Sequence, residues 1–198
     1  MTHLILASSS PARKRLLDAA GVAFHCQPAQ IDEAKLRSNL QGAPPADIAE
    51  ALAEAKALQI SQCVPDALVL GADQILALPD GRILSKADNR EEAGAQLRLL
   101  RDCGRHDLIS AQVCAEAGRS VWRYVSTAQL VMRPFSDEFL DDYLNQCMDT
   151  VLGSVGCYHI EGLGAQLFSR IEGDIFTIQG LSLIAVLDYL RDRNLIAT

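Results

Sequence analysis

The sequence has little of what marks several large classes of protein. None of its apolar runs reaches the ~18 to 20 residues that a membrane-spanning helix needs. Aromatic residues make up only 5% of the chain, and 25 acidic residues exceed 18 basic ones, for a formal net charge of −7. A general nucleic-acid binder needs a basic face. We therefore expect neither a membrane nor a nucleic acid as a partner.

Metal-binding and secretory signals are also missing. The chain has six cysteines but no Cys-x-x-Cys pair, and its four histidines form no ligand spacing with them. No positive segment precedes the apolar N-terminus, as a secretory signal would require. We expect a cytoplasmic protein with reduced cysteines. Four of them lie beside or within apolar stretches and are interpreted as buried small hydrophobes: Cys63, Cys103, Cys114 and Cys147.

What the sequence does contain is a mixture of strand and helix patterns. Strands are expected at 3–7, 22–27, 67–72, 75–78, 82–84, 108–115, 122–132, 166–171 and 175–178, and helices at 11–20, 46–62, 89–100, 136–147 and 181–192. Residues 28–42 show no period. Hairpins and crossovers together predict an α/β fold with a mixed twisted sheet and flanking helices, split into two lobes. No linker separates independent domains, so 1–198 is taken as one domain.

The first candidate site lies where a short apolar strand passes through Ser8 and Ser10 into a helix that starts at Pro11. The N–H groups of such a helix start favour an anion. Helical spacing places Arg13 on the inward face with Leu16 and Leu17. An inward arginine needs an anionic ligand or an internal carboxylate as its partner, and both alternatives stay open.

The second candidate is Asp73, which ends a buried apolar strand, the place where open α/β sheets bind ligands. A buried carboxylate needs a cation or a metal beside it. If Asp80-Gly81 forms a two-residue hairpin loop, Lys86 lies diagonal to Asp73 on the same face, roughly 7–8 Å away. This pair indicates either a metal-phosphate site or an ordinary salt bridge.

Two further positions carry weaker signals. Lys56 borders the apolar stripe of its helix, where it either reaches a ligand or extends along the edge into solvent. The pair Asp32-Glu33 lies in the stretch without a period, and by itself it consists only of acidic loop residues.

Taken together, these segments resemble the Maf family of nucleoside triphosphate pyrophosphatases. The resemblance covers residues 4 to about 190 and rests on the number and order of its motifs. They are Leu-Ala-Ser-x-Ser-Pro-x-Arg-x-x-Leu-Leu (6–17), Asp-Glu (32–33), Leu-Ala-x-x-Lys-Ala (52–57), Gly-Ala-Asp (71–73), Ser-Lys (85–86), Gly-Cys-Tyr-His-Ile-Glu-Gly (156–162), Ile-x-Gly-Asp (171–174) and Gly-Leu-Ser-Leu (180–183).

The resemblance implies a fold like that of the house-cleaning inosine triphosphate pyrophosphatases, with two lobes around a cleft. It implies hydrolysis of a nucleoside triphosphate to the monophosphate and pyrophosphate, with Mg²⁺ or Mn²⁺, in the cytoplasm and often in a homodimer. Asp73 matches the general base, and Asp73 with Glu33 matches the acids near the metal. The positions that match substrate contacts are Ser8, Ser10, Arg13, Lys56 and Lys86.

The chain departs from the family pattern at several positions. Ala12 and Ser154 stand where an arginine and a lysine are usual, which favours the alternative of a catalytically weak protein that binds nucleotides or a partner in cell-division control. Gln74 replaces a threonine. Glu161 replaces a glutamine linked to substrate recognition, and an ionised carboxylate only accepts hydrogen bonds. We expect Glu161 to favour a donor-rich base edge such as that of guanine.

Overall fold

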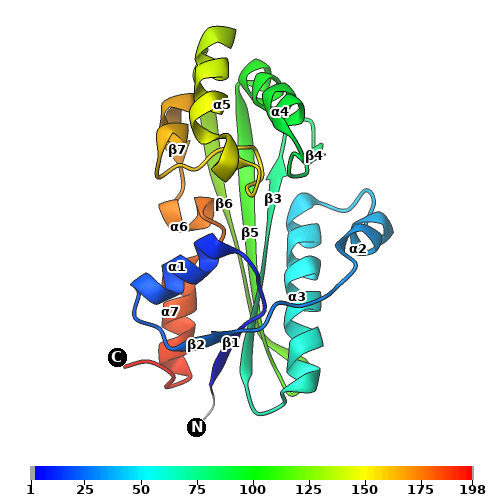
Figure 1. The fold of residues 1–198 in the computed structure, drawn as a ribbon. Helices are drawn as coiled ribbons and strands as arrows, with labels where there is room; N and C mark the ends of the chain where they lie inside the picture. Colours follow the sequence, from blue (N-terminus) through cyan, green and yellow to red (C-terminus); the bar gives the residue numbers. More distant parts are fainter. Residues whose placement is uncertain (1–2, 198) are drawn as a thin grey trace. The chain divides into compact units, whose positions relative to one another are not determined.

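A mixed sheet forms the centre of the protein, seen in a computed structural model that describes residues 3–197 (Figure 1). Within those residues it has seven strands, in the order β2-β1-β3-β5-β6-β7 with β4 paired to β3. They are β1 (Leu4–Leu6), β2 (Phe24–Cys26), β3 (Leu68–Ala77), β4 (Ile83–Leu84), β5 (Arg105–Glu116), β6 (Arg119–Met132) and β7 (Phe168–Glu172). Strand β1 is parallel to β2 and β3, whereas β4 and β7 run antiparallel to their partners. The predicted mixed α/β fold is confirmed.

The chain divides into two compact units. The first comprises the residues up to Gln74, the segment Ile109–Ser126 and the residues from Ile175 on. The second comprises Ile75–Leu108 and Thr127–Asp174. Strands β3, β5 and β6 contribute residues to both units. The units agree with the expected division into two parts, and a cleft between them stays a prediction.

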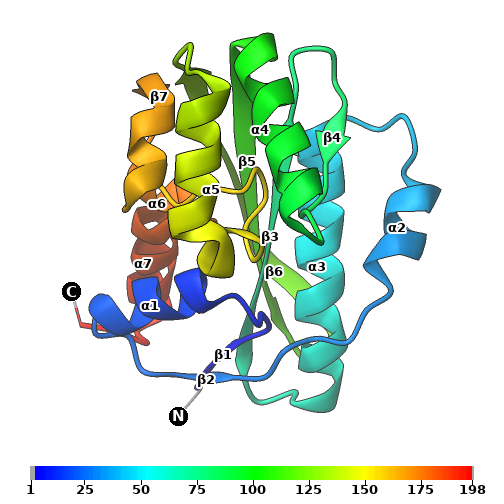
Figure 2. The same cartoon turned by 45° about the horizontal axis from the view of Figure 1, so that its top comes forward.

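In the first unit, helices cover both faces of the sheet. Helices α1 (Pro11–Ala19) and α7 (Leu183–Asp192) lie on one side of β1 and β3, and α3 (Pro45–Cys63) lies on the other (Figure 1, Figure 2). Side chains of a strand alternate between its faces, so Leu68, Leu70 and Ala72 join the core beneath α1 and α7. Gly71 and Asp73, which alternate with these residues, face α3.

Local signals explain where α1 begins. The side chain of Ser10 caps the helix by accepting a hydrogen bond from the backbone N–H of Arg13, and Pro11 occupies the first helical position, as predicted. The inward side chains Arg13 and Leu17 are both buried. The predicted inward face of this helix is therefore confirmed.

The second unit has its own layer of helices. Helix α4 (Arg90–Cys103) contacts α5 (Asp137–Val151), and a 3₁₀ turn at Leu163–Leu167 leads into β7. Asn89 caps α4 at its start, and Gly104 ends it with a φ of 72°. Both helices are predicted from the sequence, but α4 continues to Cys103 instead of ending at 100, and α5 continues to Val151 instead of ending near 147.

The strands predicted at 67–72 and 75–78 are one continuous strand, β3, so Asp73 lies within a strand and not at its end. Two further predictions of secondary structure are wrong. The sequence predicts a strand at 175–178, but Ile175–Ile178 is the short helix α6, whose Thr177 and Ile178 carbonyls accept hydrogen bonds from Gln74. It predicts no regular element at 28–42, but this stretch contains the helix α2 (Glu33–Asn39), capped by Asp32. Helix α2 buries no residue fully. A helix without a buried face needs no apolar stripe, which is the pattern by which helices are predicted.

The predicted hairpin of 75–78 and 82–84 is confirmed, but the two-residue loop considered for it is not formed. Leu76 pairs with Leu84, and Ala77 with Ile83, so the loop has three residues, Pro79-Asp80-Gly81, and the register differs by one from a two-residue loop. Gly81 has a φ of 85°, as expected for the left-handed position of such a loop. Strand β4 ends at Leu84. The strand pairing that would place Lys86 diagonal to Asp73 is therefore not formed.

All six cysteines are free. Cys114 and Cys157 are buried, and Cys103 and Cys147 are half-buried. Cys63, predicted to be buried, is exposed because it is the last residue of α3. Among residues 3–197, no helix is both long and apolar enough to cross a membrane.

Candidate active site

Asp73 lies in the buried strand β3 of the first unit, with a side chain that is 7% exposed. Gly71, two residues earlier in β3, determines how closely α3 approaches Asp73. A Cβ added at Gly71 would lie 2.1 Å from the carbonyl oxygen of Ala53 in α3. The missing side chain lets α3 pack directly on the strand. This close approach brings the α3 residues between Ala53 and Ala57 to Asp73.

Lys56 joins two acidic side chains. Its Nζ lies 2.7 Å from Oδ1 of Asp73 and 2.7 Å from Oε1 of Glu33. The lysine is buried on the inward face of α3, with Leu52 and Ile60 one turn away on either side. The alternative of a solvated Lys56 is therefore wrong, because the approach of α3 to β3 at Gly71 encloses the side chain.

Arg37 of α2 completes the charged cluster from a side that the sequence did not indicate. Its Nη2 lies 3.5 Å from Oδ2 of Asp73, and its side chain is 32% exposed. Glu33 and Arg37 are four residues apart, so both project from the same face of α2. A helix in a stretch without a period thus supplies two members of the site.

The charges of this cluster act on one another. Burial by itself raises the pKa of Glu33, but the hydrogen bond from Lys56 and the charges of Lys56, Arg37 and Arg13 outweigh it and lower that pKa. Burial lowers the pKa of Arg13, while the negative charges of Asp73 and Glu33 partly offset this effect. Electrostatic coupling thus links α1, α2 and α3 to Asp73.

Arg13 binds backbone carbonyls instead of an internal carboxylate. Its Nε donates to the Gly180 carbonyl at 2.7 Å, and its Nη1 donates to the Ala72 carbonyl at 2.9 Å and to Oγ of Ser8 at 3.0 Å. Ala72 precedes Asp73, so the guanidinium is held next to that residue. The hydroxyls of Ser8 and Ser10 accept hydrogen bonds within this same turn.

Gln74, which in the sequence is only a departure from the family pattern, links β3 to α6. Its Nε2 donates to the carbonyls of Thr177 at 2.9 Å and Ile178 at 3.0 Å, and lies 3.3 Å from Oγ of Ser110. These bonds fix α6 to β3 and place the following Gly180, whose carbonyl holds Arg13. No local pattern reveals such a link, because α6 is distant from Gln74 along the chain.

The remaining predicted residues lie in the second unit. Lys86 follows β4 and is exposed. Glu161 is also exposed, with Oε1 3.6 Å from Nδ1 of His159. Their predicted contacts with a substrate stay predictions.

The loop that carries Glu161 is tied to a buried aromatic cluster. Nε2 of His106 and the hydroxyl of Tyr158 are 2.6 Å apart, and both rings pack near Phe168. Cys157, which precedes Tyr158, has a φ of 59°, a value that few non-glycine residues adopt. Its carbonyl accepts a hydrogen bond from the Tyr143 hydroxyl at 3.1 Å. Burial lowers the pKa of His106 to about 4.

We expect His106 to make the protein acid-sensitive. The unfolded chain binds a proton at this imidazole near pH 6.5, whereas the folded protein binds it only near pH 4. Protons therefore favour unfolding, and stability falls as the pH drops from about 6.5 to about 4, by about 3 kcal/mol in total.

Denaturant unfolding at pH 7 and pH 4 measures this effect. Replacing His106 with glutamine removes the titrating group but keeps a hydrogen-bonding side chain, so its stability should fall about 3 kcal/mol less than that of the wild type over the same interval. Equal losses in the two proteins would contradict the role of His106.

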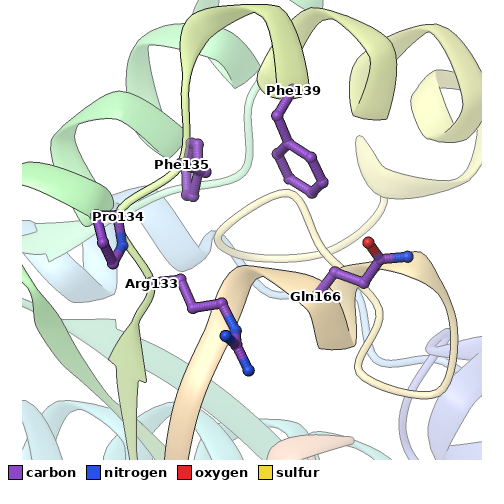
Figure 3. Close-up of a pocket in the computed structure, with 5 residues that line it drawn as sticks. All are labelled: Arg133, Pro134, Phe135, Phe139 and Gln166. Atoms are coloured by element: carbon purple, nitrogen blue, oxygen red, sulfur yellow. The ribbon is translucent and has the colours of Figure 1, made fainter.

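A pocket of about 400 Å³ lies elsewhere in the second unit (Figure 3). Arg133, Pro134, Phe135, Phe139 and Gln166 line it. Nε of Arg133 donates to the Phe168 carbonyl at 2.8 Å, and Arg101 stacks on the Phe135 ring. This lining includes no residue that the sequence predicted for the site.

The fold and the charged cluster define an α/β protein with a buried carboxylate held among cationic side chains, next to the first turn of a helix. The family model described as Maf-like protein matches residues 3–193. The chain therefore belongs to the Maf family, as the motifs predicted.

Curated relatives match over nearly their whole length. "Nucleoside triphosphate pyrophosphatase 1" of Jannaschia sp. is 50% identical over 199 residues, covering 100% of both chains. "Nucleoside triphosphate pyrophosphatase" of Sphingopyxis alaskensis is 46% identical, covering 97% of this chain and 98% of the relative. "7-methyl-GTP pyrophosphatase" of Rhizobium meliloti is 48% identical, covering 96% and 95%.

Two solved structures match this chain at much lower identity. A HAM1 protein from Coxiella burnetii is 11% identical with a TM-score of 0.43, covering 69% of this chain and 76% of that one. A nucleoside-triphosphatase, dITP/XTP pyrophosphatase, from Mycobacterium abscessus is 16% identical with a TM-score of 0.44, covering 97% and 98%.

Proposed function

We propose that this protein hydrolyses nucleoside triphosphates to nucleoside monophosphates and pyrophosphate, with Asp73 as the general base. The observation that carries the proposal is the buried carboxylate of Asp73, which contacts Lys56 and Arg37 and lies beside Arg13. The names of the curated relatives support the same reaction.

The charge balance of the cluster suits a polyanionic substrate. Arg13, Arg37 and Lys56 are positive, and Glu33 and Asp73 are negative, which leaves one positive charge in excess. Phosphoryl-transfer enzymes work mainly by positioning the substrate and neutralising its charge. In this proposal the cations orient the triphosphate, and Asp73 orients and deprotonates the attacking water.

Asp73 and Glu33 also suit a divalent metal ion. Oδ2 of Asp73 is buried and accepts no hydrogen bond, and its 3.5 Å contact with Arg37 is long, so this oxygen could serve as a ligand once Arg37 moves aside. Among residues 3–197, no group of three or more His, Cys, Asp or Glu side chains could hold a metal. Mg²⁺ is commonly bound by one or two carboxylates together with substrate phosphates. We propose that Asp73 and Glu33 hold Mg²⁺ or Mn²⁺, which neutralises phosphate charge and acidifies a bound water when present.

Product identification tests the reaction. The full chain should release pyrophosphate and a nucleoside monophosphate from at least one member of a nucleotide panel with Mg²⁺ or Mn²⁺, and EDTA should abolish release. Orthophosphate with a diphosphate would contradict the proposed bond cleavage. A protein that binds nucleotides but releases no product would support the binding alternative, which the missing cations at Ala12 and Ser154 favour.

Substrate preference is expected to depend on Glu161. A carboxylate can accept from both the N1–H and the amino group of guanine, whereas uracil offers it a single donor, N3–H, between two carbonyl oxygens that a carboxylate cannot bind. A relative named 7-methyl-GTP pyrophosphatase supports a guanine preference. We expect kcat/KM for GTP to exceed that for UTP, and Glu161→Gln to reduce this ratio about tenfold, in line with ~1–3 kcal/mol for a good base contact.

The matched control is Glu172→Gln, which removes an exposed carboxylate of the same unit that pairs with Arg170. It should leave the GTP to UTP ratio unchanged. Faster hydrolysis of UTP and dTTP than of guanine nucleotides by the wild type would refute the role of Glu161.

A further inference from the structure

Arg37 is the cation of the charged cluster with the weakest hold on its partner. Its Nη2 lies 3.5 Å from Oδ2 of Asp73, and that oxygen accepts no hydrogen bond. By contrast, Lys56 makes two 2.7 Å contacts, and Arg13 makes three hydrogen bonds to protein atoms. Because Arg37 is 32% exposed and Asp73 keeps its 2.7 Å contact with Lys56, Arg37 can exchange its partner at a lower cost than either other cation.

Polar contacts connect α3 with helix α2, which carries Arg37, and with the residues just before it. Helix α2 buries no residue fully. Glu33 binds Lys56 of α3, and just before the helix the backbone of Gln30 exchanges two hydrogen bonds with the Gln59 side chain of α3, at 2.7 and 2.8 Å. An element with little buried apolar area opens and shifts more easily than the core. Its position can therefore follow the charges beside it.

A phosphate offers Arg37 a better partner than Asp73 does. Guanidinium and phosphate groups form parallel charge-assisted hydrogen bonds, whereas the contact with Asp73 is a single long one. Ala12 leaves α1 without the second arginine that the motif usually has. Helix α2 brings one guanidinium to Asp73, next to the Ala72 carbonyl that holds Arg13.

We propose that Arg37 binds the polyphosphate chain of the substrate, leaving Oδ2 of Asp73 when the polyanion arrives and replacing the cation that Ala12 lacks. The inference rests on the proposed function, since it assigns a further substrate-binding residue to the same site. It makes α2 a part of the binding site instead of a surface helix.

Calorimetric titration with inorganic tripolyphosphate in EDTA tests this role without base, metal or turnover. We expect Arg37→Gln to weaken binding at least fivefold. Arg37→Lys should recover part of the affinity, because it restores the charge without the planar fork. The matched control is Lys35→Gln, which removes the same charge from an exposed position of the same helix and should change the affinity less than twofold.

A purely structural clamp on Asp73 predicts the opposite result. If Arg37 only pairs with Oδ2 of Asp73, Arg37→Gln leaves tripolyphosphate binding unchanged, and this result would overturn the proposal. Equal losses of affinity in Arg37→Gln and Lys35→Gln would also overturn it. Pyrophosphate release from nucleotides, measured on the same samples, separates the two ideas. If the wild type hydrolyses nucleotides and Arg37→Gln binds tripolyphosphate as tightly as the wild type, only the role of Arg37 is refuted and the proposed reaction stands. If Arg37→Gln loses tripolyphosphate affinity and Lys35→Gln does not, but the wild type hydrolyses no nucleotide, the proposed reaction is refuted and the binding role of Arg37 is supported. A wild type that binds no tripolyphosphate overturns the proposal.

Discussion

Replacing Asp73 with asparagine should lower the rate of pyrophosphate release by a factor of about 10² to 10⁴, the usual contribution of a general base. Asparagine has nearly the same shape but does not accept the proton of water at neutral pH. It also removes one of the two carboxylates that are proposed to hold the metal. Initial rates with saturating nucleotide and Mg²⁺ measure the loss.

Binding measurements distinguish a lost base from a damaged site. The substitution Asp73→Asn would raise the positive excess of the cluster by one charge, so tripolyphosphate should bind at least as tightly as to the wild type. Asp66→Asn, at an exposed position of the same unit, is the control and should keep full activity. A variant Asp73→Asn that retains more than a third of the rate would exclude Asp73 as the base.

Replacing Gly71 with alanine should destabilise the protein by about 3 kcal/mol or more, measured as the free energy of unfolding in denaturant. The new Cβ would lie 2.1 Å from the Ala53 carbonyl oxygen, 2.7 Å from the backbone nitrogen of Ala57 and 2.9 Å from its Cβ. Two of these atoms belong to the backbone of α3, so no side chain can move aside. Clashes that force a backbone shift reach the upper end of overpacking costs.

The same substitution should reduce activity in whatever fraction stays folded, because α3 would carry Lys56 away from Asp73. Gly153→Ala is the matched control, since its Cβ would meet only the Thr150 carbonyl at an ordinary 3.8 Å. A Gly71→Ala protein as stable as Gly153→Ala would show that α3 does not rest directly on β3.

Several features of the site were predictable from local patterns. Ser10, Pro11 and the inward position of Arg13 follow from capping and from helical period, and both depend on neighbours within one turn. Asp73 stands out because a carboxylate directly follows an apolar run, although β3 continues past it to Ala77 instead of ending there. The motif order then identified the family without any coordinates.

Other features depend on contacts between distant segments. The segment 175–178 has the composition of a strand but forms a helix whose final carbonyls bind Gln74. The hairpin loop has three residues, Pro79-Asp80-Gly81, whereas the sequence alone is equally compatible with a two-residue loop and a strand register that differs by one. In both cases, tertiary hydrogen bonds and turn geometry override a weak local preference.

Patterns along the chain were enough to predict the class of fold, the helix start beside Ser10, and Arg13 and Asp73 as candidate site residues, because period and capping are local. Packing in three dimensions established the rest: Lys56 is buried between Asp73 and Glu33, Gly71 permits this contact, and Arg37 reaches Asp73. Each of these depends on how closely α2, α3 and β3 approach one another, a distance that no pattern along a single element contains.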